Sequence, residues 1–351
     1  MPTETMTPRE RWTAVLTRQK PDRVPMDYWA TGEATNKLLA RLGCDFPTML
    51  QKLHIDLPYD VGPAYVGPTP PEGQDLYGLK YRTVDYGAGV YTEAVNSPLS
   101  EYETVEEIEA SYTWPSIDWW DFSVIPGQVK GHEHQPIRGG GSEPFLLYKL
   151  LRGEEQAFID LIENPEMVHY GLGKLYDLAY QTTERILEAA GGHVLFSYVA
   201  EDVGGQETLM YSPGQIREFF HPHMKRMIDL VHSAGAYVFH HTDGAVRDII
   251  PDLVKLGFDV LNPIQWRCRG MEREGLKRDF GDKLVFHGAV DNQQTIPFGT
   301  VDDVREEVAY NLQVLGEGGG YILAPCHNIQ AVGPAENVVA LYEAGYELGW
   351  S

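Results

Sequence analysis

A histidine and an aspartate two positions apart, together with a distant cysteine, are the residues best suited to chemistry in this sequence. His241 and Asp243 lie in the segment His-Thr-Asp-Gly at 241–244, and Cys326 lies much further along the chain. A neutral imidazole, a carboxylate and a thiolate suit Zn²⁺, and three protein ligands leave a fourth position open for substrate. The residues also have structural explanations, because Asp243 can cap a turn and a single cysteine is often a small buried apolar residue.

Further polar side chains directly follow the apolar runs of the second half of the chain. If those runs are parallel strands of a barrel, the side chains meet at one mouth although they are far apart in sequence. These residues are Glu201, Asp202, Gln265, His287, Asp291, His327 and Asn328.

The elements that must position these residues are short apolar runs alternating with longer amphipathic segments. Such alternation predicts a parallel sheet with right-handed crossovers, and nearly continuous apolar strands indicate a sheet buried on both faces. We expect strands at 24–29, 194–199, 236–240, 260–262, 283–286 and 321–324, and helices at 7–18, 212–234, 246–256, 301–315 and 334–347.

An open, doubly wound sheet would fit the same alternation of strands and helices. The recurrence of polar residues beyond the carboxyl ends of the strands favours a closed barrel, where the active site gathers at that face. We therefore predict one (β/α)8 TIM barrel over residues 1–351, with an irregular, loop-rich N-terminal region to about residue 135. The glycine-rich segment 138–142 lacks a P-loop lysine, and a flexible loop is favoured over an anion site there.

The composition of the chain limits the classes of partner that it is expected to bind. The chain has 28 basic and 51 acidic residues, a net charge of −23, which disfavours binding to nucleic acid or to an anionic membrane. Three scattered cysteines suit a reducing compartment, and the start of the chain at 1–5 lacks the features of a signal peptide, so a cytoplasmic enzyme is expected. The oligomeric state stays open, with a homodimer as one option.

Several segments of the second half together resemble the uroporphyrinogen decarboxylase superfamily. The resemblance begins at Thr7-Pro8-Arg9-Glu10-Arg11 and is specific in the last 150 residues or so. It implies one (β/α)8 barrel with its site in the carboxyl-terminal mouth. The segments that carry it are 212–265 with His241-Thr242-Asp243-Gly244, Val260-Leu261-Asn262-Pro263-Ile264-Gln265, His287-Gly288-Ala289-Val290-Asp291, Cys326-His327-Asn328 and Pro334-Ala335-Glu336-Asn337-Val338.

The superfamily has two branches, and residues of this chain resemble one branch more than the other. The decarboxylase branch carries paired arginines after the first strand, whereas the matching segment 24–32 has no arginine and contains Asp27. With the net charge of −23, this argues against a substrate with many carboxylates. The other branch contains zinc-dependent methyltransferases that use a His-x-Cys pair and a distant cysteine. This resemblance implies His241 and Cys326 as ligands, with Asp243 in place of the middle cysteine, or with Glu201 as third ligand and Asp243 orienting His241.

The function expected from the resemblance is a zinc-dependent methyltransferase. It would move a methyl group between a small methylated substrate, a methoxy compound or a thiol, and a corrinoid carried by a partner protein. His287, Asp291, Gln265 and Asn328 would orient the substrate or donate protons. Two alternatives are a decarboxylase or lyase acting on a small organic acid, with Asp243 or His287 as general acid, and a barrel that binds a ligand without catalysis.

Overall fold

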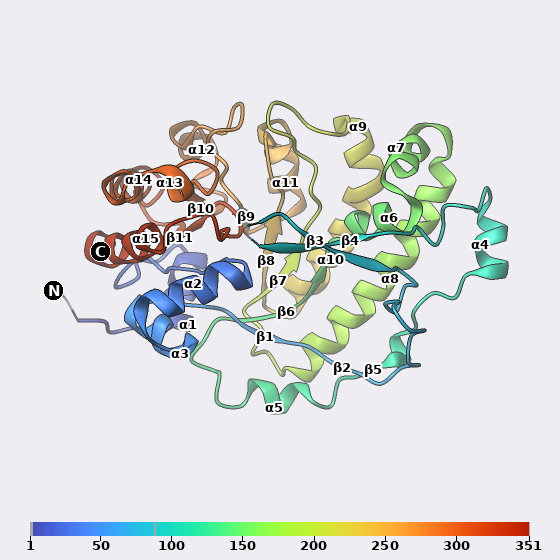
Figure 1. Cartoon of the computed structure of the whole chain (residues 1–351), viewed down its shortest axis with the longest axis horizontal. Coiled ribbons are helices and arrows are strands. Elements are labelled where there is room, and N and C mark those ends of the chain that lie inside the picture. The colour runs from blue at the N-terminus through green and yellow to red at the C-terminus, as the bar shows by residue number, and fades with distance from the viewer. Residues whose placement is uncertain (1–2, 88, 351) are drawn as a thin grey trace.

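A parallel sheet of seven strands forms the centre of the computed structural model, which describes residues 3–87 and 89–350 (Figure 1). Met1 and Pro2, the first residues of the segment 1–5 considered above for a signal peptide, lie outside the described residues. The predicted α/β fold with a parallel sheet is confirmed. In spatial order the strands are β1 (Tyr59–Val61), β6 (Ile137–Ser142), β7 (Phe196–Val199), β8 (Tyr237–His241), β9 (Val260–Asn262), β10 (Val285–Val290) and β11 (Tyr321–Pro325).

Helices follow the strands of the sheet from β6 onward and pack along it (Figure 1). The predicted helices after β7, β8, β10 and β11 are present, whereas the three helices after β6 were not predicted. The helices are α6 (Pro144–Arg152), α7 (Glu154–Glu163), α8 (Pro165–Ala189), α9 (Pro213–Gln215), α10 (His221–Ser233), α11 (Ile250–Leu256), α12 (Arg273–Phe280), α13 (Thr295–Phe298), α14 (Val301–Val314) and α15 (Ala335–Leu348).

The predicted first strand at 24–29 is not a regular strand, and this prediction is corrected. Leu323 donates its N–H to Pro25 and accepts from Asp27, so the segment lies along β11 through isolated bridges. On the other side, the N–H of Asp56 donates to the carbonyl of Met26. Pro25 has no N–H, and the N–H of Met26 donates to the Asp56 side chain, so a continuous strand ladder cannot form here.

The segment 138–142 belongs to strand β6, so the prediction of a flexible loop there was wrong. Strand β6 pairs with β1 and β7, with an irregular register between Arg138 and Gly141. A Cβ on Gly141 would lie 1.7 Å from the carbonyl oxygen of Tyr198, and the residue has a φ of +94°. The glycines are therefore required by close packing inside the sheet.

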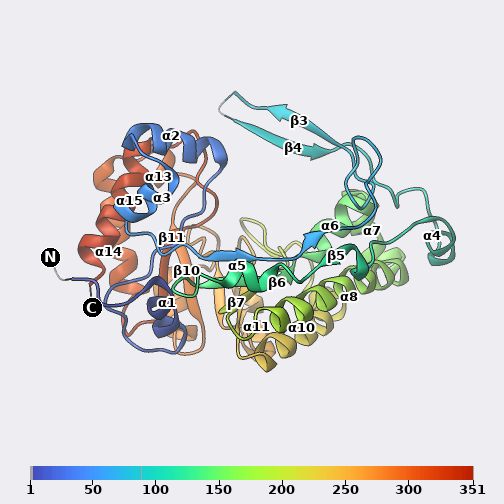
Figure 2. The same cartoon turned by 90° about the horizontal axis from the view of Figure 1, so that it is seen from below.

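The loop-rich region before β6 contains short helices and two small sheets. The hairpin of β3 (Tyr81–Asp85) and β4 (Val90–Ala94) extends from the side of α6 and α7 toward α2 (Figure 2). Its tip contacts Glu33 of α2 through the N–H of Val90. No helix in the described part of the chain has the length and apolarity to span a bilayer. The remaining elements are α1 (Pro8–Leu16), α2 (Gly32–Leu42), α3 (Phe46–Lys52), α4 (Val105–Ser111), α5 (Ile125–Val129), β2 (Ala64–Tyr65) and β5 (Trp120–Asp121).

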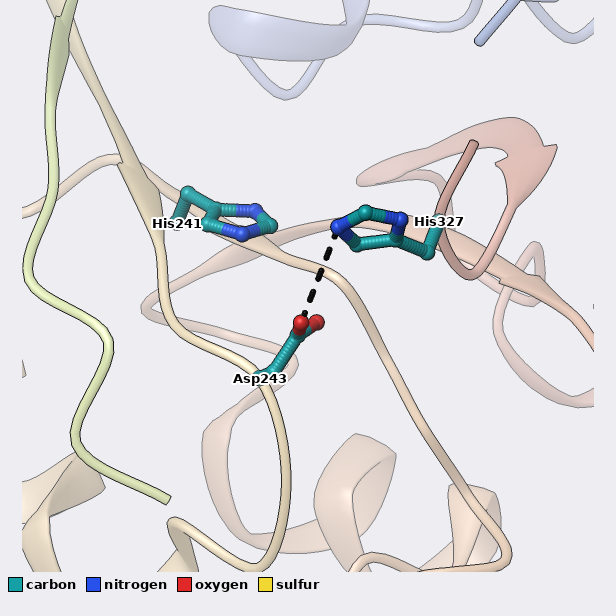
Figure 3. A group of neighbouring side chains, drawn as sticks. All are labelled: His241, Asp243 and His327. Carbon is teal, nitrogen blue, oxygen red and sulfur yellow. Dashed lines mark ion pairs between the residues drawn. The ribbon is translucent and has the colours of Figure 1, made fainter. Parts of the chain in front are cut away.

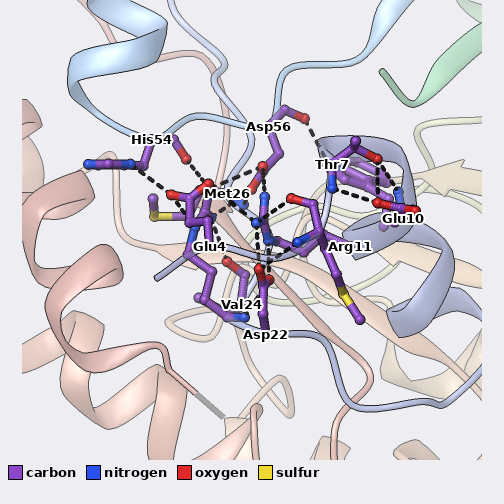
Figure 4. A network of polar contacts seen from close by, with 12 residues as sticks. Glu4, Thr7, Glu10, Arg11, Asp22, Val24, Met26, His54 and Asp56 are labelled. Atoms are coloured by element: carbon purple, nitrogen blue, oxygen red, sulfur yellow. Dashed lines mark hydrogen bonds and ion pairs between the residues drawn. The ribbon is translucent and has the colours of Figure 1, made fainter. Parts of the chain in front are cut away.

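A buried cluster of charges holds the start of the chain against the sheet (Figure 4). The carboxylate of Asp56 accepts from Arg11 Nη1 at 2.5 Å and from Arg23 Nη1 at 2.8 Å. The side chains of Arg11 and Asp56 are 0% and 1% exposed. Asp22 accepts from Arg11 as well, and Glu4 pairs with Arg23, but Asp56 is the most deeply buried of the three carboxylates. Removing it takes away much of the compensation of two buried charges.

We expect Asp56→Asn to lower the free energy of unfolding by about 3–5 kcal/mol, because two buried guanidinium groups lose their shared carboxylate. Urea titration of both proteins measures the change. Asp229→Asn is the matched control, since Asp229 pairs with Lys225 on the exposed face of α10. That change should cost less than about 0.5 kcal/mol. Equal stability of wild type and Asp56→Asn would contradict the structural role of the cluster.

Candidate metal centre

Three side chains at the carboxyl ends of two strands form a group that can hold a metal ion (Figure 3). His241 is the last residue of β8, Asp243 follows in the next loop, and His327 follows β11. One ligand atom from each residue lies within 4.8 Å of the other two. His327 Nε2 and Asp243 Oδ2 are 3.7 Å apart. The predicted convergence of strand ends thus brings His241 and Asp243 together with His327.

The donor chemistry of the group fits a divalent cation. Asp243 Oδ1 is buried and has no hydrogen-bond partner among the described residues, which is unusual for a buried carboxylate oxygen. Burial raises the pKa of Asp243, although His241 and His327 oppose that increase. A cation at this position would compensate the buried carboxylate. Two imidazoles and one carboxylate are a ligand set used for Zn²⁺ and for other first-row metals.

A row of buried polar side chains continues from His241 across the neighbouring strands. The parallel register pairs His241 of β8 with Asn262 of β9, and their Nδ1 and Oδ1 atoms are 2.6 Å apart. Asn262 Nδ2 lies 2.7 Å from Nδ1 of His287, which belongs to β10. His287 Nε2 lies 2.9 Å from Oδ2 of Asp27, in the segment beside β11. Strand register therefore places these groups at one level of the sheet.

Two of the predicted ligands, Cys326 and Glu201, are not part of the group of three. Cys326 is 2% exposed, its Sγ donates to the carbonyl of Ile264 at 3.1 Å, and burial raises the pKa of its thiol far above the ordinary value. Glu201 accepts from the Tyr176 hydroxyl at 2.7 Å and from the N–H of Phe145. Both side chains thus have other contacts, and the geometry favours His327 as the third ligand.

The four residues expected to orient substrate or transfer protons occupy different environments. His287 is fully buried within β10, not beyond its end. Asp291 pairs with Arg267 at 2.7 Å and accepts from the N–H groups at 293–295, contacts typical of a loop cap. Gln265 accepts from the N–H of Gly244 and so supports the loop that carries Asp243. Asn328 is the member that faces open space, since it lines a cavity.

The sequence alone predicts no role in this arrangement for His327, Asn262 or Asp27. The position of His327 after a strand places it at the mouth but does not indicate its part in a group of ligands. Asn262 is expected only as a strand residue, and Asp27 only as an acidic residue that disfavours a polycarboxylate substrate. Their joint position depends on contacts between distant segments, for which a single sequence carries no signal.

The cavity lies beside the group of His241, Asp243 and His327 and has a volume of about 640 Å³. Trp29 and Tyr198 line it, and their rings lie 5.8 Å and 5.9 Å from the ring of His241. Arg138 also lines the cavity and is paired through two hydrogen bonds with Asp60. The cavity is therefore aromatic on the side nearest His241, with a neutralised ion pair in its wall.

Carboxylates make the surroundings of the group acidic. Asp202 accepts from the N–H of Asp243 at 2.7 Å. Burial raises the pKa of Glu143; His241 opposes this increase, whereas Asp202 and Asp243 add to it. A small anion would therefore meet an unfavourable potential next to His241, whereas a cation or neutral molecule would not.

Glu201 should make stability depend on pH. Burial raises the pKa of Glu201 from 4.5 to about 8, so the folded protein keeps a proton that the unfolded chain releases. The contribution of Glu201 to the free energy of unfolding is then fully present below about pH 4.5 and is lost as the pH rises toward 8. We expect unfolding measurements to show that wild type loses roughly 3–5 kcal/mol more than Glu201→Gln between pH 5 and pH 9.

The control for this measurement is Glu188→Gln, at an exposed position of α8, which should keep the pH dependence of the wild type. Parallel pH profiles of wild type and Glu201→Gln would show that Glu201 is ionised in the folded protein near neutral pH.

Comparison with known proteins agrees with this architecture. The chain matches the family model of uroporphyrinogen decarboxylase over residues 128–348, more than half of its length. It is 26% identical over 209 residues to the methylcobamide:CoM methyltransferase MtaA of Methanosarcina barkeri, covering 60% of this chain but only 57% of that protein. Identity to the uroporphyrinogen decarboxylase of Pseudoalteromonas translucida is 24% over 302 residues, covering 80% and 76% of the two chains.

A solved structure, a methyltransferase from Methanosarcina mazei, has the same fold with a TM-score of 0.69. The sequences are 19% identical, and the superposition covers 98% of this chain and 99% of that chain. The family match, the relatives and the shared fold together lead to one conclusion: this chain belongs to the uroporphyrinogen decarboxylase family.

Proposed function

We propose that the protein is a metal-dependent methyltransferase that takes a methyl group from an oxygen atom of a small substrate and passes it to a corrinoid on a partner protein. The group of His241, Asp243 and His327 beside an aromatic cavity is the observation that carries this proposal. Similarity to a methylcobamide:CoM methyltransferase supports the methyl-transfer chemistry and the corrinoid partner. In the transfer, the Co(I) corrinoid of the partner would supply the electron pair of the new Co–C bond, while the substrate oxygen keeps the pair of the broken C–O bond and takes up a proton.

His241, Asp243 and His327 would hold the ion, which we propose to be Zn²⁺. When bound there, the ion would supply Lewis acidity toward an oxygen of the substrate. Two neutral imidazoles and one carboxylate leave a divalent ion with a net charge of about +1, whereas each thiolate ligand would remove a further unit of charge. A harder ligand set of this kind favours oxygen over sulfur as the substrate atom.

The residues of the cavity would bind and orient the substrate. Trp29 and Tyr198 offer aromatic surface next to His241, and Asn328 offers an amide close to His327. The carboxylates of Glu143 and Asp202 disfavour an anionic thiolate at this position, which again supports an oxygen-bearing methyl donor. Arg138 is already paired with Asp60, so a porphyrinogen with many carboxylates would find poor charge compensation.

The proposal includes a closed barrel. Segment 23–30 hydrogen-bonds to β11 on one side and to Asp56, just before β1, on the other, and would form the eighth position of the barrel wall. This closure would bring the ends of all the strands around the cavity.

We expect the purified protein to contain one divalent ion per chain, measured by elemental analysis. His241→Ala, Asp243→Ala and His327→Ala should each weaken metal binding by more than about a hundredfold, because each removes a direct ligand. Cys326→Ser is the discriminating variant. It should bind metal within about threefold of wild type if His327 is the third ligand, and as weakly as the alanine variants if Cys326 is a ligand.

Activity is tested with methoxylated compounds and reduced cobalamin, whose methylation changes its visible absorbance. We expect methyl transfer that stops when a chelator removes the ion and returns when Zn²⁺ is restored. Methyl transfer by a metal-free preparation would contradict the proposal. Release of CO2 from small organic acids, without methylation of cobalamin, would instead support the decarboxylase alternative.

A further inference from the structure

We propose that Asp27 is a positioning residue that sets the tautomer of His241 through His287 and Asn262. In this arrangement Nε2 of His241 carries no proton, and its lone pair is available to bind a metal ion. The inference deepens the proposed function, since it rests on His241 being a metal ligand. It concerns four side chains, of which Asp27 and His287 lie far from the ion-binding group along the row.

The direction of the hydrogen bonds along the row is set at Asp27. Its Oδ1 accepts from the backbone N–H of Tyr28 at 2.8 Å, and its Oδ2 accepts from the indole N–H of Trp29 at 2.8 Å. Both of these donors lack any acceptor capacity, so the two carboxylate oxygens must act as acceptors. A carboxylate has no donor, so in the third contact, between His287 Nε2 and Oδ2 at 2.9 Å, the histidine is the donor.

The remaining steps follow from the chemistry of neutral imidazole and amide groups. A neutral His287 with its proton on Nε2 has an acceptor at Nδ1, which receives the N–H of Asn262 at 2.7 Å. The other end of the amide, Oδ1 of Asn262, then faces Nδ1 of His241 at 2.6 Å and can only accept. The proton of His241 is thereby placed on Nδ1, and Nε2 is left as the ligand atom.

The direction of these hydrogen bonds matters because the row is buried. Asp27 is 2% exposed, Asn262 and His287 are 0% exposed, and His241 is 6% exposed. Water cannot readily replace a lost partner in such a row, so each donor must meet its acceptor. If the amide of Asn262 were reversed, it would donate to His241 Nδ1, and the proton of His241 would move to Nε2. That tautomer cannot bind a metal ion through Nε2.

The test is Asp27→Asn, with two readouts. Imidazole ¹⁵N chemical shifts of the metal-free protein report the tautomers of His241 and His287, and competition with a chromophoric chelator gives the affinity for Zn²⁺. We expect wild type to carry protons on His241 Nδ1 and His287 Nε2. An amide whose oxygen accepts from the N–H of Tyr28 turns its NH2 group toward His287 Nε2, so both tautomer assignments should change and Zn²⁺ affinity should fall about 10- to 100-fold.

Two further variants separate positioning from general destabilisation. Asp160→Asn removes a fully buried carboxylate of α7 that pairs with Arg152 of α6, and should leave the tautomers unchanged and the affinity within about threefold. Asn262→Asp keeps an acceptor toward His241 Nδ1 whatever residue occupies position 27. Adding Asp27→Asn to Asn262→Asp should therefore change Zn²⁺ affinity by less than about threefold.

The inference is overturned if metal-free wild type carries the His241 proton on Nε2, if His287 is doubly protonated, or if Asp27→Asn binds Zn²⁺ as wild type does. An equal loss of affinity on adding Asp27→Asn in both backgrounds would likewise assign Asp27 a merely structural role. If wild type binds no Zn²⁺, the proposed function fails, whereas the tautomers of the metal-free protein still decide the role of Asp27.

Discussion

The shared carboxylate of Asp56 is the interaction on which the rest of the structure depends. It joins Arg11 of α1 to Arg23 and to the N–H of Met26, so the start of the chain is fixed beside both β11 and the residues before β1. The same segment carries Asp27 and Trp29, which are hydrogen-bonded to each other and line the cavity. A buried ion cluster is weak as a source of net stability, because desolvation offsets much of its attraction. Its value here is positional, since it places Asp27 opposite His287.

From Asp27 onward the polar interior is organised by strand register. Adjacent parallel strands β8, β9 and β10 bring His241, Asn262 and His287 side by side, and all three side chains are buried. Hydrogen-bond direction is then transmitted along the row, as in the carboxylate–histidine pairs that orient ligands at many metal sites. The centre at the mouth and the ion cluster at the start of the chain are thus parts of one connected arrangement.

The family contains decarboxylases and methyltransferases on one fold, and fold alone does not separate them. The side chains of the mouth bear on which substrate the site can take. Glu143, Asp202 and Asp243 give it an acidic character, and its arginine is neutralised by Asp60. Such a site suits a cation with a neutral, aromatic or oxygen-bearing ligand better than a polycarboxylate. The excess of acidic residues in the whole chain acts in the same direction.

The sequence by itself determined the α/β class, the helices that follow Thr7 and Thr300, and the position of polar residues at the ends of strands, because capping and apolar periodicity are local properties. It also singled out His241 and Asp243. Only the tertiary structure places His327, and not Cys326, in the group with His241 and Asp243, since the two neighbouring side chains after β11 point in different directions. The irregular path of segment 24–29 and the row ending at Asp27 were likewise decided there, because they depend on Asp56 and His287, residues distant in sequence.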